Sequence, residues 1–166
     1  MTEERRRSTP TPEQLRIWRG FIETGETLRA RLAAQLQSES SLSTGDYQVL
    51  LALSEAEGHT ARSSELAALI GWERSRLSHH LGRMEKRGLV RRVPCADGVH
   101  GVDVVLADAG AEAFRAANIP HLRAIRELFV DALSPEQLAN VDDITAALRT
   151  HLGLEGDDHP ADLSRG

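Results

Sequence analysis

The sequence predicts one mainly α-helical domain with a small antiparallel β-hairpin, on three observations. Apolar residues recur every three or four positions over most of the 166 residues, which is the spacing of one helix face. Two short β-branched runs, residues 88–94 and 102–106, flank the turn dipeptide Asp97-Gly98 and interrupt that spacing once. The composition is ordinary, with 40% hydrophobic residues, six prolines and one cysteine, so collagen-like, disordered and disulfide-scaffold classes are excluded.

The first two helices are predicted from capping signals. Residues 11–14 (TPEQ) combine an N-cap threonine, a proline at N1 and a glutamine at N3, so a helix is expected to begin near residue 12. Its apolar stripe covers roughly seven turns and comprises Trp18, Phe21, Gly25, Leu28, Leu32 and Leu36. Ser43, with Asp46 three residues later, opens a second helix that is expected to close at Glu57-Gly58.

The next two helices are short and close together. Ser63 or Ser64 is expected to open the third helix, which carries Leu66, Leu69 and Ile70. Gly71 ends it, and a fourth apolar pattern of Leu77, Leu81 and Met84 begins only a few residues later. This spacing predicts a helix, a tight turn and a second helix.

The hairpin and two further helices complete the chain. Asp108 can cap a fifth helix that runs to Leu133, with Pro120 bending or interrupting it near the middle. Residues 134–137 (SPEQ) repeat the capping device of residues 11–14 and begin a sixth helix. The apolar positions of that helix are Leu138, Val141, Ile144, Leu148 and Leu152.

Charge is unevenly distributed along the chain. The net charge is −5, yet residues 71–92 hold seven Lys or Arg residues against two carboxylates, a local charge of +5. The rest of the chain therefore carries −10. An acidic body with one basic segment is typical of a protein that presents a single face to a polyanion.

The fourth helix concentrates donors opposite its apolar stripe. On a wheel of about 100° per residue, Ser75, His79, Arg83 and Lys86 lie opposite Leu77, together with the small Gly82. Arg76 and Ser78 flank these residues, whereas Arg74 and His80 lie nearer the edges of the apolar stripe, and no carboxylate falls on the face. A helix that enters the major groove needs long donors, short hydroxyls and freedom from negative charge.

The helix pair, the turn and the basic hairpin together predict a winged helix-turn-helix that binds DNA. We define the reading face as Ser75, Arg76, Ser78, His79 and Arg83, which we expect to lie closest to the bases. Ser63, Ser64, Arg74, Lys86, Arg91 and Arg92 are expected mainly to hold phosphates. The full set of expected DNA-binding residues is Ser63, Ser64, Arg74, Ser75, Arg76, Ser78, His79, His80, Arg83, Lys86, Arg91, Arg92 and His100.

Five segments together carry a family resemblance: residues 42–50 (LSTGDYQVL), 64–67 (SELA), 72–81 (WERSRLSHHL), 84–90 (MEKRGLV) and 106–110 (LADAG). In this order they resemble the MarR (multiple antibiotic resistance regulator) family over about residues 12–152. The resemblance implies an obligate homodimer built from the first and the last two helices, with one winged-helix lobe per subunit. It also implies binding to a pseudo-palindromic operator, usually as a repressor. The resemblance further implies that DNA is released when a small phenolic or lipophilic ligand occupies the cleft between the dimer region and the DNA lobe, or when a cysteine is oxidised.

The tip of the wing departs from the family pattern. The family usually carries Asp-x-Arg there, with the arginine entering the minor groove, whereas residues 97–100 here are DGVH. His100 could substitute if protonated, or Arg91 and Arg92 could hold the backbone while the tip contributes little.

The predicted organisation has five parts. They are a disordered tail (1–10), dimerisation helices (11–38 and 108–152), a winged helix-turn-helix DNA-binding lobe (42–106) and an acidic tail (153–166). The apolar runs fall far short of the ~20 residues needed to cross a bilayer, and the first 20 residues show no secretory signal. A cytoplasmic protein with no membrane partner is therefore expected.

Some residues could instead serve a function other than DNA binding. Trp18, Phe21 and Tyr47 are candidate contacts for an unidentified small-molecule effector, although aromatic residues at helical spacing usually belong to a core. Cys95 precedes the wing turn and could act as a redox switch, but a structurally neutral cysteine is expected. The histidines are too scattered to predict a metal site, and no cofactor is implied.

Catalytic motifs are missing from the sequence: it contains no GxSxG, HExxH, phosphate loop or GxGxxG, so an enzyme is not expected. The remaining alternatives are a helical protein-interaction adapter and a redox- or metal-responsive version of the same DNA-binding fold. An adapter would not need a carboxylate-free cationic face.

Overall fold

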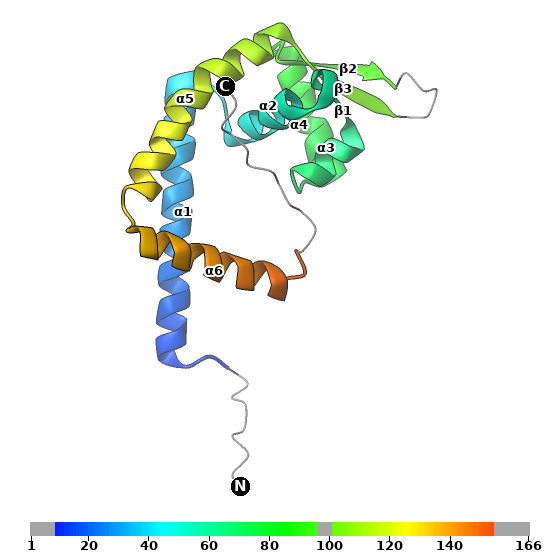
Figure 1. Cartoon of the computed structure of the whole chain (residues 1–166). Coiled ribbons are helices and arrows are strands. Elements are labelled where there is room, and N and C mark those ends of the chain that lie inside the picture. Colours follow the sequence, from blue (N-terminus) through cyan, green and yellow to red (C-terminus); the bar gives the residue numbers. More distant parts are fainter. Residues whose placement is uncertain (1–8, 96–100, 155–166) are drawn as a thin grey trace.

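The computed structural model describes residues 9–95 and 101–154, which form a helical body with a small antiparallel sheet (Figure 1). The elements are α1 (Pro12–Ser40), α2 (Thr44–Glu55), η1 (Glu57–His59), β1 (Thr60–Arg62), α3 (Ser63–Leu69), α4 (Arg74–Lys86), β2 (Val90–Pro94), β3 (Val102–Leu106), α5 (Asp108–Ile125), η2 (Arg126–Val130) and α6 (Pro135–His151). The predicted fold class is confirmed.

Three helices begin at the predicted capping boxes. Thr11, Ser43 and Ser134 are the N-caps of α1, α2 and α6, and each side chain accepts a hydrogen bond from the backbone three residues later. The side chain at that third position bonds back to the N-cap N–H in every case. These reciprocal bonds satisfy donors that a helix start otherwise leaves unpaired.

Two of the remaining predicted helix ends need correction, whereas α3 begins at Ser63 as predicted. Asp108 is the first residue of α5 and not its N-cap, because Ala107 occupies that position without a capping side chain. The second helix ends at Glu55, and Gly58 adopts a left-handed φ of 61° in η1 instead of closing that helix.

The fifth helix also differs from its prediction. Pro120 lies inside α5 without interrupting it, although proline has no N–H to donate along the helix. The α-helix ends at Ile125, well before Leu133, and continues as the π-helical turn η2.

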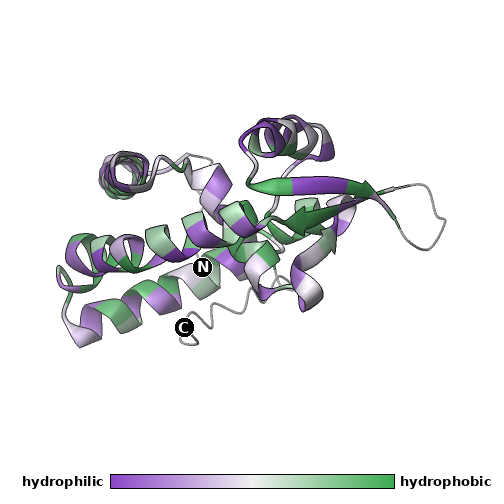
Figure 2. Cartoon of the chain, turned by 90° about the horizontal axis from the view of Figure 1, so that it is seen from above, coloured by the Kyte–Doolittle hydropathy of each residue, from purple (hydrophilic) through white to green (hydrophobic). Residues whose placement is uncertain are grey.

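The sheet has one strand more than predicted. Within the described residues its order is β1-β3-β2, and both pairings are antiparallel. The predicted hairpin forms in the register Val90↔Leu106 and Arg92↔Val104, and it extends away from the helices (Figure 2). Strand β1 adds Ala61↔Val104 on the other side of β3. A strand of three residues is too short to show the alternation by which strands are predicted.

The hydrophobic core lies in the lobe formed by α2, α3, α4 and the sheet. Its fully buried side chains come from all of these elements and include Leu50, Leu53, Leu66, Leu77, Leu81, Met84, Val90 and Val104. Phe114 and Ala117 connect α5 to this core, and α5 also packs along α1 (Figure 1). By contrast, Leu36 is the one buried residue of α1, and none of the described residues of α6 is buried.

The predicted tails, 1–10 and 153–166, lie almost wholly outside the described residues. No helix in the described part of the chain is long and apolar enough to cross a membrane.

Candidate nucleic-acid interface

Helix α4 is held at a fixed angle to α3 by a tight turn. Gly71 adopts a φ of 67°, in the left-handed region that glycine occupies without strain. The backbone N–H of Trp72 then donates to the carbonyl of Ala67 at 2.8 Å, which closes the turn before α4 begins. This is the predicted helix-turn-helix.

The predicted apolar stripe of α4 is confirmed, because Leu77, Leu81 and Met84 are all essentially inaccessible to solvent. The five residues of the reading face are all exposed on the opposite side. Five expected phosphate ligands, Ser64, Arg74, Lys86, Arg91 and Arg92, are exposed as well, whereas Ser63 is half-buried. Ser78, His79, Arg83, Lys86 and Arg92 line one shared hollow, and Ser64, Arg74 and Ser75 line another.

A hollow on the reading side joins α4 to the wing. Its lining residues are Ser78, His79, Gly82, Arg83, Glu85, Lys86 and Arg92. Glu85 places a carboxylate at the border of the exposed side of α4, where the sequence pattern predicts none. The backbone N–H of Arg92 donates to Glu85 at 2.9 Å, and the Arg92 guanidinium forms an ion pair with it at 2.8 Å. These contacts, led by the backbone hydrogen bond, lower the pKa of Glu85.

Arg92 therefore has a second role, because it ties β2 to α4. Its charge is partly neutralised by Glu85, which leaves Arg91 and Lys86 as the more available phosphate ligands among the three. His100 and the remainder of the wing tip lie outside the described residues.

His80 requires a correction. It was expected among the DNA-binding residues, but it is only 8% exposed and faces α2 instead of solvent. Its position at the edge of the apolar stripe allows the ring to turn inward, where the carboxylate of Asp46 lies 3.0 Å from Nε2. His80 is therefore an internal residue beneath the face.

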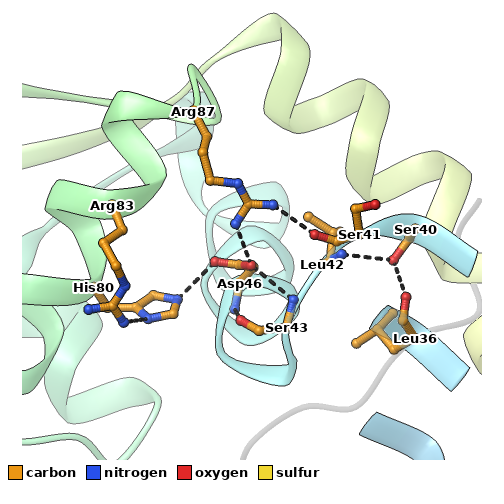
Figure 3. A network of polar contacts seen from close by, with 9 residues as sticks. All are labelled: Leu36, Ser40, Ser41, Leu42, Ser43, Asp46, His80, Arg83 and Arg87. Atoms are coloured by element: carbon orange, nitrogen blue, oxygen red, sulfur yellow. Dashed lines mark hydrogen bonds and ion pairs between the residues drawn. The ribbon is translucent and has the colours of Figure 1, made fainter. Parts of the chain in front are cut away.

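Asp46 is the centre of a polar network between α2 and α4 (Figure 3). Arg87 donates to its Oδ2 at 2.7 Å and also to the carbonyl of Ser41 at 2.8 Å. Burial alone would raise the pKa of Asp46, but hydrogen bonds from Ser43 and Arg87 outweigh it and lower the pKa. The sequence revealed Asp46 only as a capping residue and Arg87 only as one more cation of the basic segment.

Trp72, the aromatic residue of the turn, also supports the reading face. Trp72 packs against the core, and its ring lies under the guanidinium of Arg76, whose Cζ is 4.0 Å from the ring centroid. The same ring meets His80 edge to face, with centroids 5.2 Å apart. The spacing of four residues between Trp72 and Arg76 could have predicted this contact from the sequence.

The candidate ligand contacts are not brought together within one chain. Tyr47 is buried, donates from its hydroxyl to Asn118 at 2.6 Å, and contacts the rings of Phe114 and His121. Burial raises its pKa to about 12. Trp18 and Phe21 are instead 58% and 60% exposed on the N-terminal half of α1, away from α2 (Figure 1).

Cys95 forms a local contact at the base of the wing. Its thiol donates to Asp103 at 3.1 Å, and this bond raises the pKa of Cys95, which disfavours the reactive thiolate. Among residues 9–95 and 101–154, no group of three or more His, Cys, Asp or Glu could hold a metal ion.

Comparison with known proteins gives one consistent result. Residues 40–98 match the sequence model of the MarR family. The crystal structure of AbsC, a MarR family transcriptional regulator from Streptomyces coelicolor, is 35% identical, with a TM-score of 0.81 over 87% of this chain and 97% of that one. A second MarR family transcriptional regulator from the same organism, solved in complex with DNA, is 34% identical, with a TM-score of 0.81 over 87% and 94% of the two chains.

A more distant structure shares the fold alone. It is a mutant of MarR from E. coli complexed with operator DNA, which is 20% identical with a TM-score of 0.72 over 85% of this chain and 99% of that one. A search of the curated proteins finds no match.

Proposed function

This chain belongs to the MarR family of transcriptional regulators, and on that premise we propose that it binds a pseudo-palindromic operator as a homodimer and represses transcription. One observation carries the proposal. The side of α4 opposite its buried stripe is exposed and holds Arg76, His79 and Arg83 among short hydroxyls. A relative that is 34% identical over 87% of this chain was solved in complex with DNA.

The proposed interface divides into two functions. Arg76, His79 and Arg83, with Ser75 and Ser78, contact base edges in the major groove, where arginine donates to guanine N7 and O6. Ser63, Ser64, Arg74, Lys86, Arg91 and Arg92 contact phosphates and set the orientation of the lobe. His80 is excluded from this set because it is buried.

The homodimer is supported by apolar surface that one chain leaves uncovered. Ile17, Trp18 and Phe21 of α1 and Ile119 of α5 are each more than half exposed. The C-terminal half of α6 also leaves apolar side chains uncovered, with Ile144 53% and Leu148 43% exposed, and Leu152 directly after the helix is 65% exposed. Apolar surface of this extent marks an interface, and a two-fold dimer would set two α4 helices about 34 Å apart, one turn of B-DNA.

Substitutions at the two arginines of the reading face test the proposal. Arg76→Glu with Arg83→Glu should abolish binding to every duplex in a fluorescence-anisotropy titration, because like charges then face the phosphates. Arg76→Lys with Arg83→Lys is the matched control, since it keeps both charges but loses bidentate recognition of guanine. It should retain binding to random duplex and lose preference for the operator.

The outcome separates DNA binding from the adapter alternative. If the Glu variants bind the operator as the unsubstituted protein does, the reading face is wrongly assigned. If the unsubstituted protein itself binds no duplex, a helical interaction module becomes the better account.

A further inference from the structure

The two arginines of the reading face are each held from beneath by an aromatic ring. The guanidinium of Arg76 stacks on Trp72, with Cζ 4.0 Å from the ring centroid. The guanidinium of Arg83 lies 2.8 Å from Nδ1 of His80. Both rings belong to the buried side of the helix-turn-helix, and neither was predicted to orient an arginine.

The contact between Arg83 and His80 fixes the state of the imidazole. A guanidinium only donates hydrogen bonds, so Nδ1 of His80 must accept and carry no proton. The neutral ring therefore holds its proton on Nε2, the atom that faces Oδ1 of Asp46 at 3.0 Å. Burial lowers the pKa of His80, which favours this neutral form although the Asp46 carboxylate opposes the shift.

The two rings also limit each other's movement. Trp72 and His80 meet edge to face, with centroids 5.2 Å apart. Gly45 of α2 lies against both, because a Cβ atom there would stand 2.7 Å from Cη2 of Trp72 and 3.0 Å from Cε1 of His80. Asp46, the next residue, is held by its capping box and by Arg87 (Figure 3).

We propose that Trp72 and His80 are positioning residues that direct Arg76 and Arg83 toward the bases before DNA arrives. This inference rests on the proposed function. Long arginine side chains lose rotamer freedom when they bind, and a side chain that is already oriented loses less. Binding to random duplex depends on the charge of the two arginines and not on their orientation. The two rings therefore govern preference for the operator more than non-specific affinity.

Two substitutions at His80 test its contact with Arg83 separately from its contact with Asp46. His80→Asn places an amide oxygen where Nδ1 stood, so Arg83 keeps its acceptor. His80→Gln places its terminal amide near Nε2 and leaves Arg83 without an acceptor. We expect the ratio of operator to random-duplex affinity to fall about two- to tenfold for His80→Gln, and to stay within about twofold for His80→Asn. The salt dependence of binding should be unchanged in both.

A double-mutant cycle distinguishes positioning from a general effect on the fold. In an Arg83→Ala background, His80→Gln should lower the ratio no further, because the side chain through which it acts is gone. Likewise, Trp72→Leu should lower the ratio no further in an Arg76→Ala background. Equal losses for His80→Asn and His80→Gln, or an undiminished loss in the Arg83→Ala background, would overturn the proposal.

The unsubstituted protein offers a test that does not depend on how variants fold. Nitrogen-15 NMR of the imidazole should show His80 protonated on Nε2 and unprotonated on Nδ1. A proton on Nδ1 would contradict the proposal, since that atom could not accept from Arg83. Absence of any operator preference in the unsubstituted protein would instead refute the proposed function, and the positioning role with it.

Discussion

At the scale of single residues, base contacts and phosphate contacts should respond differently to truncation. Arg83→Ala or Arg76→Ala should each reduce operator affinity by about 1–3 kcal/mol and relax the sequence preference, because a bidentate contact to guanine is lost. Lys86→Ala or Arg91→Ala should weaken all duplexes alike and reduce the slope of log affinity against log salt by about one. Competition titrations at several salt concentrations measure both quantities. Identical behaviour of the two pairs would refute the division of roles.

One buried and one half-buried histidine predict how stability depends on pH. Burial lowers the pKa of both His80 and His121 from the ordinary value of 6.5. As pH falls through 6.5, the unfolded chain takes up protons that the folded chain still excludes, so the free energy of unfolding should decrease. Urea titrations at pH 7.5 and 5.5 test this. His121→Phe, which keeps a ring against Tyr47, should reduce the decrease, and an equal decrease in that variant would exclude His121 as a source.

At the scale of elements, one glycine fixes how α5 approaches the wing. A Cβ atom at Gly110 would overlap the carbonyl oxygen of Leu89 and lie 2.9 Å from its carbonyl carbon. Ala107 already donates its backbone N–H to that oxygen at 3.1 Å, so the backbone cannot retreat freely. Gly110→Ala should therefore destabilise the protein by about 1–3 kcal/mol, although alanine normally favours a helix.

Gly20→Ala is the matched control for that substitution. Gly20 is also helical, and nothing in the described chain lies within 4 Å of where its Cβ would stand. The substitution should stabilise the protein by about 0.5–1 kcal/mol. Chemical denaturation of the two variants gives both values, and a neutral Gly110→Ala would show that α5 can shift away from Leu89.

The elements also show which features a sequence can predict. Capping boxes such as residues 11–14 are local, and the apolar stripe of α4 is periodic, so both were predictable. Strand β1 forms because β3 offers it a free edge, which no local pattern reveals. The pairing of Asp46 with His80 joins α2 to α4 across the packed lobe, so it too depends on tertiary structure.

At the scale of the whole molecule, the terminal helices predict a dimer. Light scattering should give about twice the 18.2 kDa of one chain at micromolar concentration. Ile144→Asp with Leu148→Asp places charge on exposed apolar positions of α6 and should shift the mass toward the monomer. DNA affinity should fall in parallel, because one lobe then binds one half-site. A monomer at this concentration in the unsubstituted protein would contradict the dimer proposal.

The arrangement of the site itself was only partly predictable. Wheel geometry identified the exposed side of α4, since that depends on one helix alone. It could not show that His80 turns inward or that Glu85 binds Arg92 of the neighbouring strand. Those contacts depend on how α4 packs against α2 and β2.

The central claim, that two α4 helices of a dimer bind an operator, is tested most directly by one titration. Labelled genomic fragments flanking the protein's own gene are titrated at two salt concentrations, with random duplex as competitor. The account predicts nanomolar binding by two chains per site, a steep salt dependence, and a preference over random duplex of about a thousandfold or more. Binding no tighter than to random duplex, or by a single chain, would contradict it.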